Sequence, residues 1–528
     1  MQSISETIPE MTLKRKVVLL LISVLLMTAS FPPLDLGFLA WIGLAPVFYL
    51  VVTETRPRKA FKWAYMFGIL HWGWTIIWIA ATVNAWTHSI AGWGAWIALT
   101  LLKSLWFGLF GWMAWWLYRA RWKSLGPVCV GAAWTFMEWL RCQTGVAMPW
   151  SLSGYTQYRY LDVIQIADIT GVFGITFLLA FLNMALVEIV LNCTQRKSTF
   201  KPINHIIRQG IVPISLVLAC VAYGELRLHD IYTGSKTRIS IIQPNDRAIK
   251  DIAPVPVDIL MARATAAMER YSRMSDDAAK EHPDLIVWPE STSPLTAFGI
   301  PGIKKEWERI ALASHAWHLV GTDNPVDEHH SYNSAAIFNS TGQLSARYDK
   351  TWLVPMGEWF PLRFIPGLQQ AFDFPEDAAA GVGDQLMQIG PAKASVLICY
   401  ESVFPVIARG RSARGANLLI NITNDSWAGE SSELQQHVAM SAMRCVETRR
   451  WMASSATTGI TGFISPTGAI RGLAPYREGI LTQDVTLLDG VTVYSRVGDT
   501  FVGLLVILMV ACVLPLRKRT QEPSPPED

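Results

Sequence analysis

The sequence is poor in charged residues. Only 16% of its 528 residues are Asp, Glu, Lys or Arg, whereas about 25% is typical of a soluble domain. Mean hydropathy is correspondingly positive, at +0.26, and 51% of the residues are hydrophobic. So long and so apolar a chain is not expected to be a soluble enzyme or a disordered linker. The shortage of charge therefore predicts an integral membrane protein.

The sequence also has no large excess of positive or negative charge. Its 45 Lys and Arg nearly balance its 42 Asp and Glu, and the net charge is +3. So weak a field gives no argument for a nucleic-acid partner. The 7 cysteines are scattered without a paired spacing. That pattern argues against a disulfide framework and against a zinc site. No spacing of side chains in the sequence implies a metal or a dissociable cofactor.

Long apolar runs are what the sequence does have. A helix needs about 17–25 residues to cross a hydrocarbon core of about 30 Å. Eight candidate spans of this kind, of which the second and fifth are short, lie near 17–32, 37–52, 64–84, 92–117, 125–140, 168–192, 209–226 and 499–516. We therefore expect a seven-span transmembrane domain in 1–230, a separate domain in 231–495, and an eighth span with a polar tail in 496–528.

The basic residues between these runs fall on alternate connections, as the positive-inside rule predicts for a multi-pass protein. Basic clusters lie at 14–16, 56–62, 119–123, 196–208 and 517–519. Intervening connections such as 33–36 and 85–91 contain no Lys or Arg. The alternation predicts that both termini are cytoplasmic and that the domain after the seventh span is extracytoplasmic. A cleaved signal peptide is the alternative for the first run, but no small-residue cleavage site is evident.

Residues from about 235 to 490 alternate strand-like and helical patterns, which is typical of an α/β domain with mixed sheets. About 250 residues are enough to bury a separate core. The expected elements are strands at 237–243, 285–288, 318–322, 395–399 and 417–422, helices at 257–273 and 434–451, and hairpin turns at 339–342 and 465–468.

Three side chains stand where the chain leaves an expected strand, and α/β folds usually place their sites at strand ends. Glu290 follows one apolar run, Lys350 follows a hairpin, and Cys399 ends another apolar run. Taken singly, each is more simply a surface carboxylate, a solvated amine or a small buried hydrophobe. Together they supply a base, an electrostatic stabiliser and a nucleophilic thiolate for acyl transfer, without a histidine.

The same residues carry a resemblance to a known family. Trp288-Pro289-Glu290-Ser291, Tyr348-Asp349-Lys350 and Ile398-Cys399-Tyr400-Glu401-Ser402, in that order, resemble the Glu–Lys–Cys motifs of the nitrilase superfamily. On a polytopic chain, they resemble the bacterial apolipoprotein N-acyltransferases in particular. Further motifs similar to that family's lie at 149–157, 353–361, 424–427, 436–437, 443–444 and 458–461. The resemblance implies a membrane α-helical bundle of about eight spans joined to a nitrilase-like αββα sandwich.

The resemblance also implies roles for individual residues. Glu290 would be the general base, Lys350 the oxyanion stabiliser and Cys399 the nucleophile. Supporting roles are implied for Glu358, as a second carboxylate that orders the triad, and for Tyr400, Glu401, Trp427 and Arg450. The chain departs from the family at 245–254, which contains no Trp where the family often has one, and at Met356, where Phe is common.

What the resemblance implies about the reaction is a two-step transfer at a bacterial inner membrane. A phospholipid, with phosphatidylethanolamine the expected donor, would acylate Cys399, and the α-amino group of a diacylated apolipoprotein would then take the acyl chain. Each CH₂ prefers lipid by about 0.8 kcal/mol, so an embedded enzyme avoids extracting its substrates into water. Tryptophans at 72–78 and 112–116 would line the lipid access route or lie in the interfacial belt.

Two other interpretations use the same sequence. A membrane-tethered amidase or nitrilase would use the triad with water as acceptor, but it gives no role to seven preceding spans. A transporter or receptor would need ionisable residues inside several spans. Lys103 and Glu138 are the clearest such residues, and they are too few for a convincing pathway.

Overall fold

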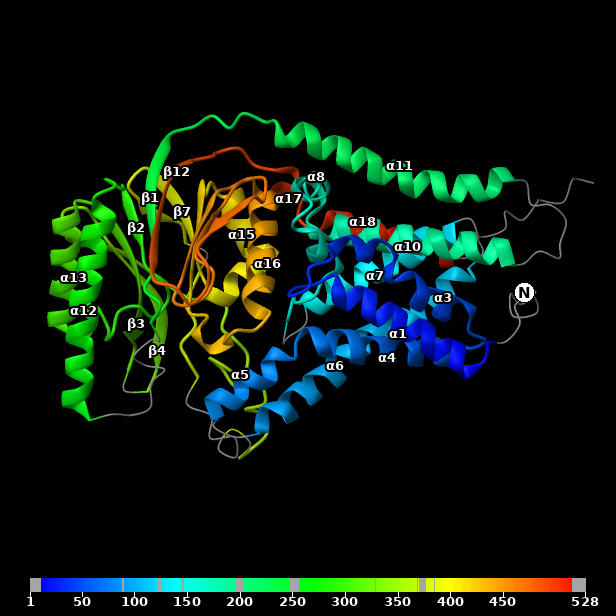
Figure 1. The fold of residues 1–528 in the computed structure, drawn as a ribbon, viewed down its shortest axis with the longest axis horizontal. Helices are drawn as coiled ribbons and strands as arrows, with labels where there is room; N and C mark the ends of the chain where they lie inside the picture. The colour runs from blue at the N-terminus through cyan, green and yellow to red at the C-terminus, as the bar shows by residue number, and fades with distance from the viewer. Residues whose placement is uncertain are drawn as a thin grey trace, which may run out of the picture.

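The structure is a computed structural model that describes residues 11–87, 90–120, 125–143, 147–194, 203–246, 256–327, 329–367, 369, 377–383 and 385–514. A helical region and a strand-rich domain lie side by side along its length (Figure 1). Some predicted features fall outside the described residues: the polar tail, segment 247–254 and parts of the basic clusters at 119–123, 196–208 and 517–519.

Helices in the N-terminal region overlap each of the seven apolar runs predicted there, but the runs at 37–52 and 64–84 are divided between shorter helices. The helices of this region are α1 (Leu13–Ala29), α2 (Ala40–Gly43), α3 (Ala45–Thr53), α4 (Pro57–Thr75), α5 (Trp78–Thr87), α6 (Ala91–Tyr118), α7 (Gly126–Gln143), α8 (Leu161–Ile164), α9 (Ala167–Thr170), α10 (Val172–Thr194) and α11 (Ile203–Leu228). After the strand-rich domain, α17 (Val493–Val497) and α18 (Thr500–Val513) bring the chain back into this helical region (Figure 1).

Only some of these helices meet the length and composition of a membrane span. Among the described residues, Gly92–Tyr118, Val172–Thr194 and Gly210–Leu228 do so, and α4 with α5 makes a fourth span if that pair, bent by 54°, crosses together. The other apolar helices are shorter; the 17 residues of α1 reach only about 25 Å at about 1.5 Å per residue. The expected count of eight spans therefore remains a prediction.

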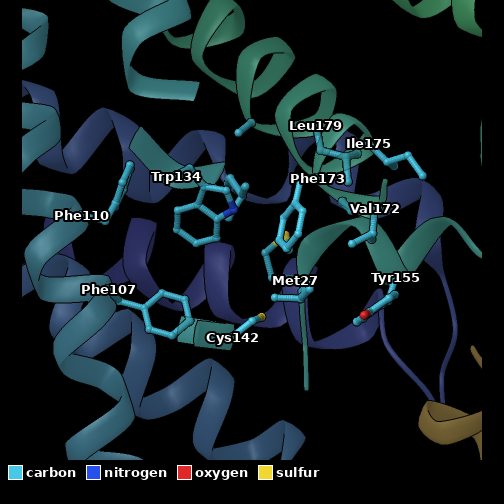
Figure 2. Close-up of a cluster of buried hydrophobic side chains, with 14 of the residues drawn as sticks. Met27, Phe107, Phe110, Trp134, Cys142, Tyr155, Val172, Phe173, Ile175 and Leu179 are labelled. Atoms are coloured by element: carbon cyan, nitrogen blue, oxygen red, sulfur yellow. The ribbon is translucent and has the colours of Figure 1, made fainter. Parts of the chain in front are cut away.

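The helical region has a core of its own, shown in Figure 2, where side chains from α1, α6, α7 and α10 meet. The rings of Phe110 and Trp134 are 4.9 Å apart in a T-shaped arrangement. Gly131 of α7 allows close approach to α10, because a Cβ there would lie 3.1 Å from the backbone nitrogen of Phe181. Small residues at such crossings are typical of packed membrane helices.

The strand-rich domain contains two mixed six-stranded sheets, with the orders β12-β1-β2-β3-β4-β5 and β11-β10-β9-β8-β7-β6. The first comprises β1 (Lys236–Gln243), β2 (Leu285–Val287), β3 (Trp317–Pro325), β4 (Ser331–Phe338), β5 (Leu344–Asp349) and β12 (Gly479–Thr486). The second comprises β6 (Met387–Ile389), β7 (Ala392–Ile398), β8 (Leu418–Thr423), β9 (Met452–Ala456), β10 (Gly462–Ile464) and β11 (Ile470–Gly472). Apolar residues of both sheets form one core, so the sheets pack face to face.

Helices cover the outer face of each sheet, which completes the predicted αββα sandwich. α12 (Val257–Ala279) and α13 (Pro301–Ser314) cover the first sheet on the side away from the helical region (Figure 1). α15 (Pro405–Ala413) and α16 (Glu433–Thr448) lie between the second sheet and the helical region (Figure 1). Fourteen of the 16 residues of α16 are buried, as expected of a helix that is covered on both sides.

The contact between α16 and the helical region contains a buried ion pair. The guanidinium of Arg444 donates to both oxygens of Glu447 at 2.7 and 2.8 Å, and to the hydroxyl of Tyr155 at 3.2 Å. Glu447 in turn accepts the backbone N–H of Val172, the first residue of α10, at 3.0 Å. The pair therefore fixes the sandwich to the helices, and charge-assisted hydrogen bonds of this kind are the stronger ones.

Most expected elements of the sandwich are confirmed, including both hairpins, which join β4 to β5 and β10 to β11. The expectation that the helix at 434–451 continues to its end is wrong. α16 ends at Thr448, because Arg449 adopts a left-handed backbone with φ of 53°. A non-glycine residue in that conformation stops the helical hydrogen-bond pattern.

Candidate active site

The predicted triad residues come from the ends of strands in both sheets. Glu290 follows β2 after Trp288-Pro289, Lys350 follows β5 directly, and Cys399 follows β7 directly. All three are buried, with exposed fractions of 5%, 1% and 6%. The Lys350 ammonium lies 3.5 Å from Glu290, and the Cys399 thiol interacts electrostatically with both charges. The structure thus brings together three residues that are distant in the sequence.

Both carboxylate oxygens of Glu290 are held by hydrogen-bond donors. The side chain of Asn333, on β4, donates from Nδ2 to Oε1 at 2.6 Å. The backbone N–H of Asn424, just after β8, donates to Oε2 at 2.7 Å. Donors on both oxygens, with an ammonium nearby, stabilise the ionised carboxylate and fix its direction. An ionised, oriented carboxylate is what a general base requires.

Lys350 lies between two carboxylates. Its Nζ donates to Glu358 Oε1 at 2.8 Å and lies 3.5 Å from Glu290 Oε1. Burial alone would lower the pKa of Lys350, but the charges of Glu358 and Glu290 outweigh it and raise that pKa above its ordinary value. The side chain is therefore an ammonium at neutral pH, which is suited to stabilising an oxyanion.

Glu358 is a second carboxylate beside Lys350. It also accepts the N–H of Val354 at 2.8 Å and Nδ2 of Asn333 at 3.0 Å. Burial opposes ionisation, but Lys350 and these hydrogen bonds hold the pKa of Glu358 below its ordinary value. Asn333 therefore bridges the two carboxylates that flank the ammonium.

Cys399 begins a short turn, Cys399–Val403, and has a left-handed backbone with φ of 52°. This conformation is unfavourable for a side chain with a Cβ and is typical of functional sites. Burial, with a further contribution from the charge of Glu290, raises the pKa of the Cys399 thiol well above its ordinary value, although Lys350 opposes the shift. The sulfur is therefore a thiol at neutral pH, and a base must take its proton during attack.

Glu401 holds that turn in place. Its carboxylate accepts the N–H of Ile398 at 2.9 Å, the hydroxyl of Tyr348 at 2.7 Å and the N–H of Thr351 at 2.8 Å. Tyr348 and Thr351 flank Lys350 in the chain. One buried carboxylate therefore ties the turn that carries the nucleophile to the segment that carries the ammonium.

Tyr400 and Trp427 lie where the sandwich meets the helical region. The Tyr400 hydroxyl donates to the carbonyl of Ala147, and its ring stacks on that of Trp150 with centroids 6.0 Å apart. The ring of Trp427 lies 5.8 Å from that of Trp78, on α5. Trp78, one of the tryptophans expected near 72–78, therefore contacts the sandwich through Trp427.

The other expected groups lie elsewhere. Trp115 donates to the carbonyl of Glu54, while Trp112 and Trp116 are exposed on α6. Arg450 is not brought to the triad, because its guanidinium donates to four backbone carbonyls. These belong to Ala416, Thr448, Arg449 and Gly490. Arg450 thus ties the segments before β8 and β9 to the chain that follows β12, and none of the hydrogen bonds given for it among the described residues reaches the triad.

His437 is a buried residue near the nucleophile to which the sequence gave no role. Its Nε2 lies 2.7 Å from the hydroxyl of Ser402, which donates to the carbonyl of Cys399 at 2.9 Å. Its Nδ1 faces Asp425 at 3.7 Å and Glu433 at 3.8 Å. These three side chains include ligand types that suit a cation. However, a protonated imidazole supplies the positive charge that the carboxylates need.

The pKa of His437 agrees with that explanation. Burial would lower it, but Asp425 and Glu433 raise it to about 9. The residue therefore carries a proton at neutral pH and helps to hold the turn at Cys399. Asn333 and Asn424 are two further site residues that the sequence left without roles. For Asn424 the available signals were its place in the motif at 424–427 and its position shortly after the strand expected at 417–422, whereas Asn333 had none.

A buried carboxylate, ammonium and thiol between the sheets of an αββα sandwich define an enzyme domain of the nitrilase type. Comparison with known families agrees: the carbon-nitrogen hydrolase family model matches residues 252–491, and the apolipoprotein N-acyltransferase N-terminal domain model matches residues 23–185. The helical region and the sandwich are thus matched by separate models.

Relatives that match nearly the whole chain contain both the helical region and the sandwich. An apolipoprotein N-acyltransferase from Geobacter metallireducens is 32% identical over 498 residues, which cover 92% of each chain. Another from Azotobacter vinelandii is 30% identical over 95% of each chain. Among solved structures, an amidase from Nesterenkonia sp. aligns with 52% of this chain and 97% of its own, at 17% identity and a TM-score of 0.38. The chain belongs to the apolipoprotein N-acyltransferase family, and it is an acyltransferase.

Proposed function

We propose that the protein moves an acyl chain from a phospholipid, through a thioester on Cys399, to the α-amino group of the S-diacylglyceryl-cysteine at the N-terminus of lipoproteins. The observation that carries the proposal is the contact between Tyr400, next to the nucleophile, and Trp150 of the helical region. A site built against apolar helices suits lipid substrates, whereas hydrolysis of a small soluble amide would not need that contact.

In the first step, the sulfur of Cys399 attacks the ester carbonyl carbon of the phospholipid while Glu290 takes the thiol proton. The ammonium of Lys350 stabilises the negative charge on the carbonyl oxygen. The C–O bond of the ester then breaks, and Glu290 returns the proton to the departing lysophospholipid. A thioester on Cys399 remains.

In the second step, the α-amino group of the acceptor attacks the thioester carbonyl. Glu290 takes a proton from the amine, Lys350 again stabilises the oxyanion, and the C–S bond breaks. The sulfur leaves and regains its proton from Glu290, so that the enzyme returns to its starting state. The products are an amide on the acceptor and free Cys399, and no cofactor takes part.

The same proposal includes the arrangement in the membrane. Residues 1–230 would form seven spans, 231–495 the extracytoplasmic catalytic domain, and 496–528 an eighth span and tail, with both termini in the cytoplasm of a bacterial cell. Support comes from the shorter helices, because α1 and α18 pack into the same apolar core as the long α10. Phosphatidylethanolamine is the proposed donor in that inner membrane.

Mass spectrometry of the purified protein after incubation with phosphatidylethanolamine tests the chemistry. We expect an acyl adduct on Cys399 that hydroxylamine removes and that Cys399→Ala lacks. Glu290→Gln should form no adduct while it keeps the wild-type melting temperature. An adduct on another residue, or release of free fatty acid with no transfer to a diacylated lipopeptide, would contradict the proposal and favour the hydrolase alternative.

A further inference from the structure

A polar hollow lies beside the catalytic base, between the end of β1 and the segments that follow β8 and β9. Its volume is about 360 Å³, and its lining residues are Asn245, Ser426, Gly429, Glu430, Thr458 and Tyr476. This volume is within the range of sites that bind small ligands, which runs from about 300 to 1,000 Å³. None of the triad residues lines it, so the hollow is distinct from the site of bond formation.

Asn424 connects the hollow to the triad. Its backbone N–H binds Glu290, while its side-chain Oδ1 accepts the hydroxyls of Ser426 at 2.8 Å and Thr457 at 2.9 Å. Ser426 lines the hollow, and Thr457 precedes another lining residue, Thr458. A group bound in the hollow would therefore lie close to the base that takes protons in both steps.

The hollow also lies near the boundary with the helical region. Ser426 begins the short helical turn Ser426–Ala428, whose Trp427 contacts Trp78 of α5. A molecule that is anchored in lipid and reaches Cys399 from that boundary could extend a polar portion into this space.

One polar atom in the lining points to a ligand. Oγ1 of Thr458 is buried, in a residue that is 5% exposed, and it has no hydrogen-bond partner among the described residues. A buried hydroxyl left without a partner costs free energy, so such atoms call for an explanation. A hydrogen-bonding group of a substrate would satisfy it.

The chemistry of the lining distinguishes between substrates. Hydroxyls and an amide can bind the N–H and C=O groups of a peptide, and the one charged lining residue is the carboxylate of Glu430. A lipid phosphate would meet a negative charge and no lining cation. The lining therefore suits the peptide portion of the acceptor rather than the phosphate of the donor.

We infer that this hollow binds the peptide segment that follows the acceptor cysteine, and that Glu430 disfavours acidic side chains in that segment. The inference rests on the proposed function. It assigns the hollow to the second step alone: the peptide lies against Asn245, Ser426 and Thr458 while its α-amino group reaches the thioester. Acceptors with Lys in that segment should be used better than acceptors with Asp.

Two diacylated lipopeptides that differ only in carrying two Lys or two Asp after the cysteine test the inference. For wild type, kcat/KM should favour the Lys peptide by up to about fivefold, chiefly through KM, because an exposed charge pair is worth at most about 1 kcal/mol. Glu430→Lys should reverse the preference, and Thr458→Val should raise KM for both peptides. Glu269→Lys, on the exposed face of α12, is the matched control and should keep the wild-type preference.

Thioester formation from phosphatidylethanolamine is measured in the same proteins. It should proceed at the wild-type rate in Glu430→Lys and Thr458→Val. Slower thioester formation in these variants would assign the hollow to the donor head group and overturn the inference. Equal use of both peptides by wild type and Glu430→Lys would also overturn it. If wild type forms no thioester on Cys399, the proposed function itself fails, which is a different result.

Discussion

Lys350 donates a 2.8 Å hydrogen bond to Glu358, and in this pair Lys350 is buried while Glu358 is partly exposed, with 18% of its side chain accessible. The ammonium lies farther from Glu290, at 3.5 Å. Glu358 thus makes the nearest ionic contact of Lys350. This arrangement agrees with the proposal that Glu290 accepts the thiol proton while Glu358 pairs with the ammonium.

Replacement of Glu358 by Gln should disable the site without changing its shape greatly. The ammonium would lose its nearest counter-charge, and breaking a buried ion pair typically costs about 3–5 kcal/mol. We expect a lower melting temperature and thioester formation slowed by about a hundredfold or more. Glu269→Gln, at an exposed position, is the control and should change neither quantity. Wild-type acylation in Glu358→Gln would contradict the assigned role.

Asn333 should couple the two carboxylates, because its Nδ2 donates to both Glu290 and Glu358. Asn333→Ala removes both hydrogen bonds, each of which is worth about 1.5–3 kcal/mol when the acceptor is charged. We expect acylation to slow by about ten- to a hundredfold. A double-mutant cycle with Glu358→Gln, measured by the acylation rate, should give less than additive losses. Strict additivity would show that the bridge has no energetic role.

The His437 cluster predicts a loss of stability at alkaline pH. The folded-state pKa of His437 is raised from 6.5 to about 9. A raised pKa contributes stability that is fully present below pH 6.5 and is lost as pH rises through about 9. Glu433 adds a loss that begins at lower pH, because burial and the charge of Asp425 raise its pKa from 4.5 to about 8, so its contribution falls between those two values. The melting temperature of the protein in detergent should therefore fall as pH rises from 6.5 to about 9.

A variant separates this effect from general alkaline denaturation. His437→Asn should show a smaller fall in melting temperature between pH 6.5 and 9 than wild type does. His282→Asn is the matched control, since His282 is exposed and left-handed, a conformation that Asn tolerates. Parallel pH profiles for wild type and His437→Asn would show that the imidazole does not carry the predicted proton.

The ion pair of Arg444 and Glu447 should stabilise the contact between the sandwich and the helical region, and should have little effect on the rate of acyl transfer. Glu447→Gln leaves a buried guanidinium without its counter-charge, at a cost of about 3–5 kcal/mol. We expect a large drop in melting temperature, with thioester formation at low temperature nearly unchanged. Glu478→Gln removes an exposed partner of Arg270 and should have little effect on either measurement.

The sequence pointed to Glu290 and Cys399 because each follows an apolar strand, and the end of such a strand is visible as a change from apolar to polar residues. Lys350 follows a hairpin strand that is largely polar, so only its motif singled it out. Asn333 was missed because it lies within a strand, where an Asn is ordinarily a surface residue. His437 was missed because the spacing of α16 does not show that both of its faces are covered. Only the packing of the second sheet against the helical region reveals that.

Other differences have similar causes. β9 was not predicted, because Met452–Ala456 contains small and polar residues and has no β-branched side chain. It is nevertheless fully buried, since β8 and β10 flank it. Arg450 was assigned to the site by the family resemblance, but the direction of its side chain depends on tertiary contacts. The number of spans was read from apolar runs, whereas helix length also depends on where glycine and proline interrupt them.

Because α16 is covered on both sides, the catalytic domain needs the helical region in order to bury this helix. The helical region is therefore more than a membrane anchor. A fragment limited to 231–495 would present Met440 and Met443 to water together with the cut ends of the Arg444 network. Such a fragment should aggregate when it is expressed alone. Attempts to make a water-soluble version would therefore need a redesigned surface on α15 and α16 and a substitute for Trp150 beneath Tyr400.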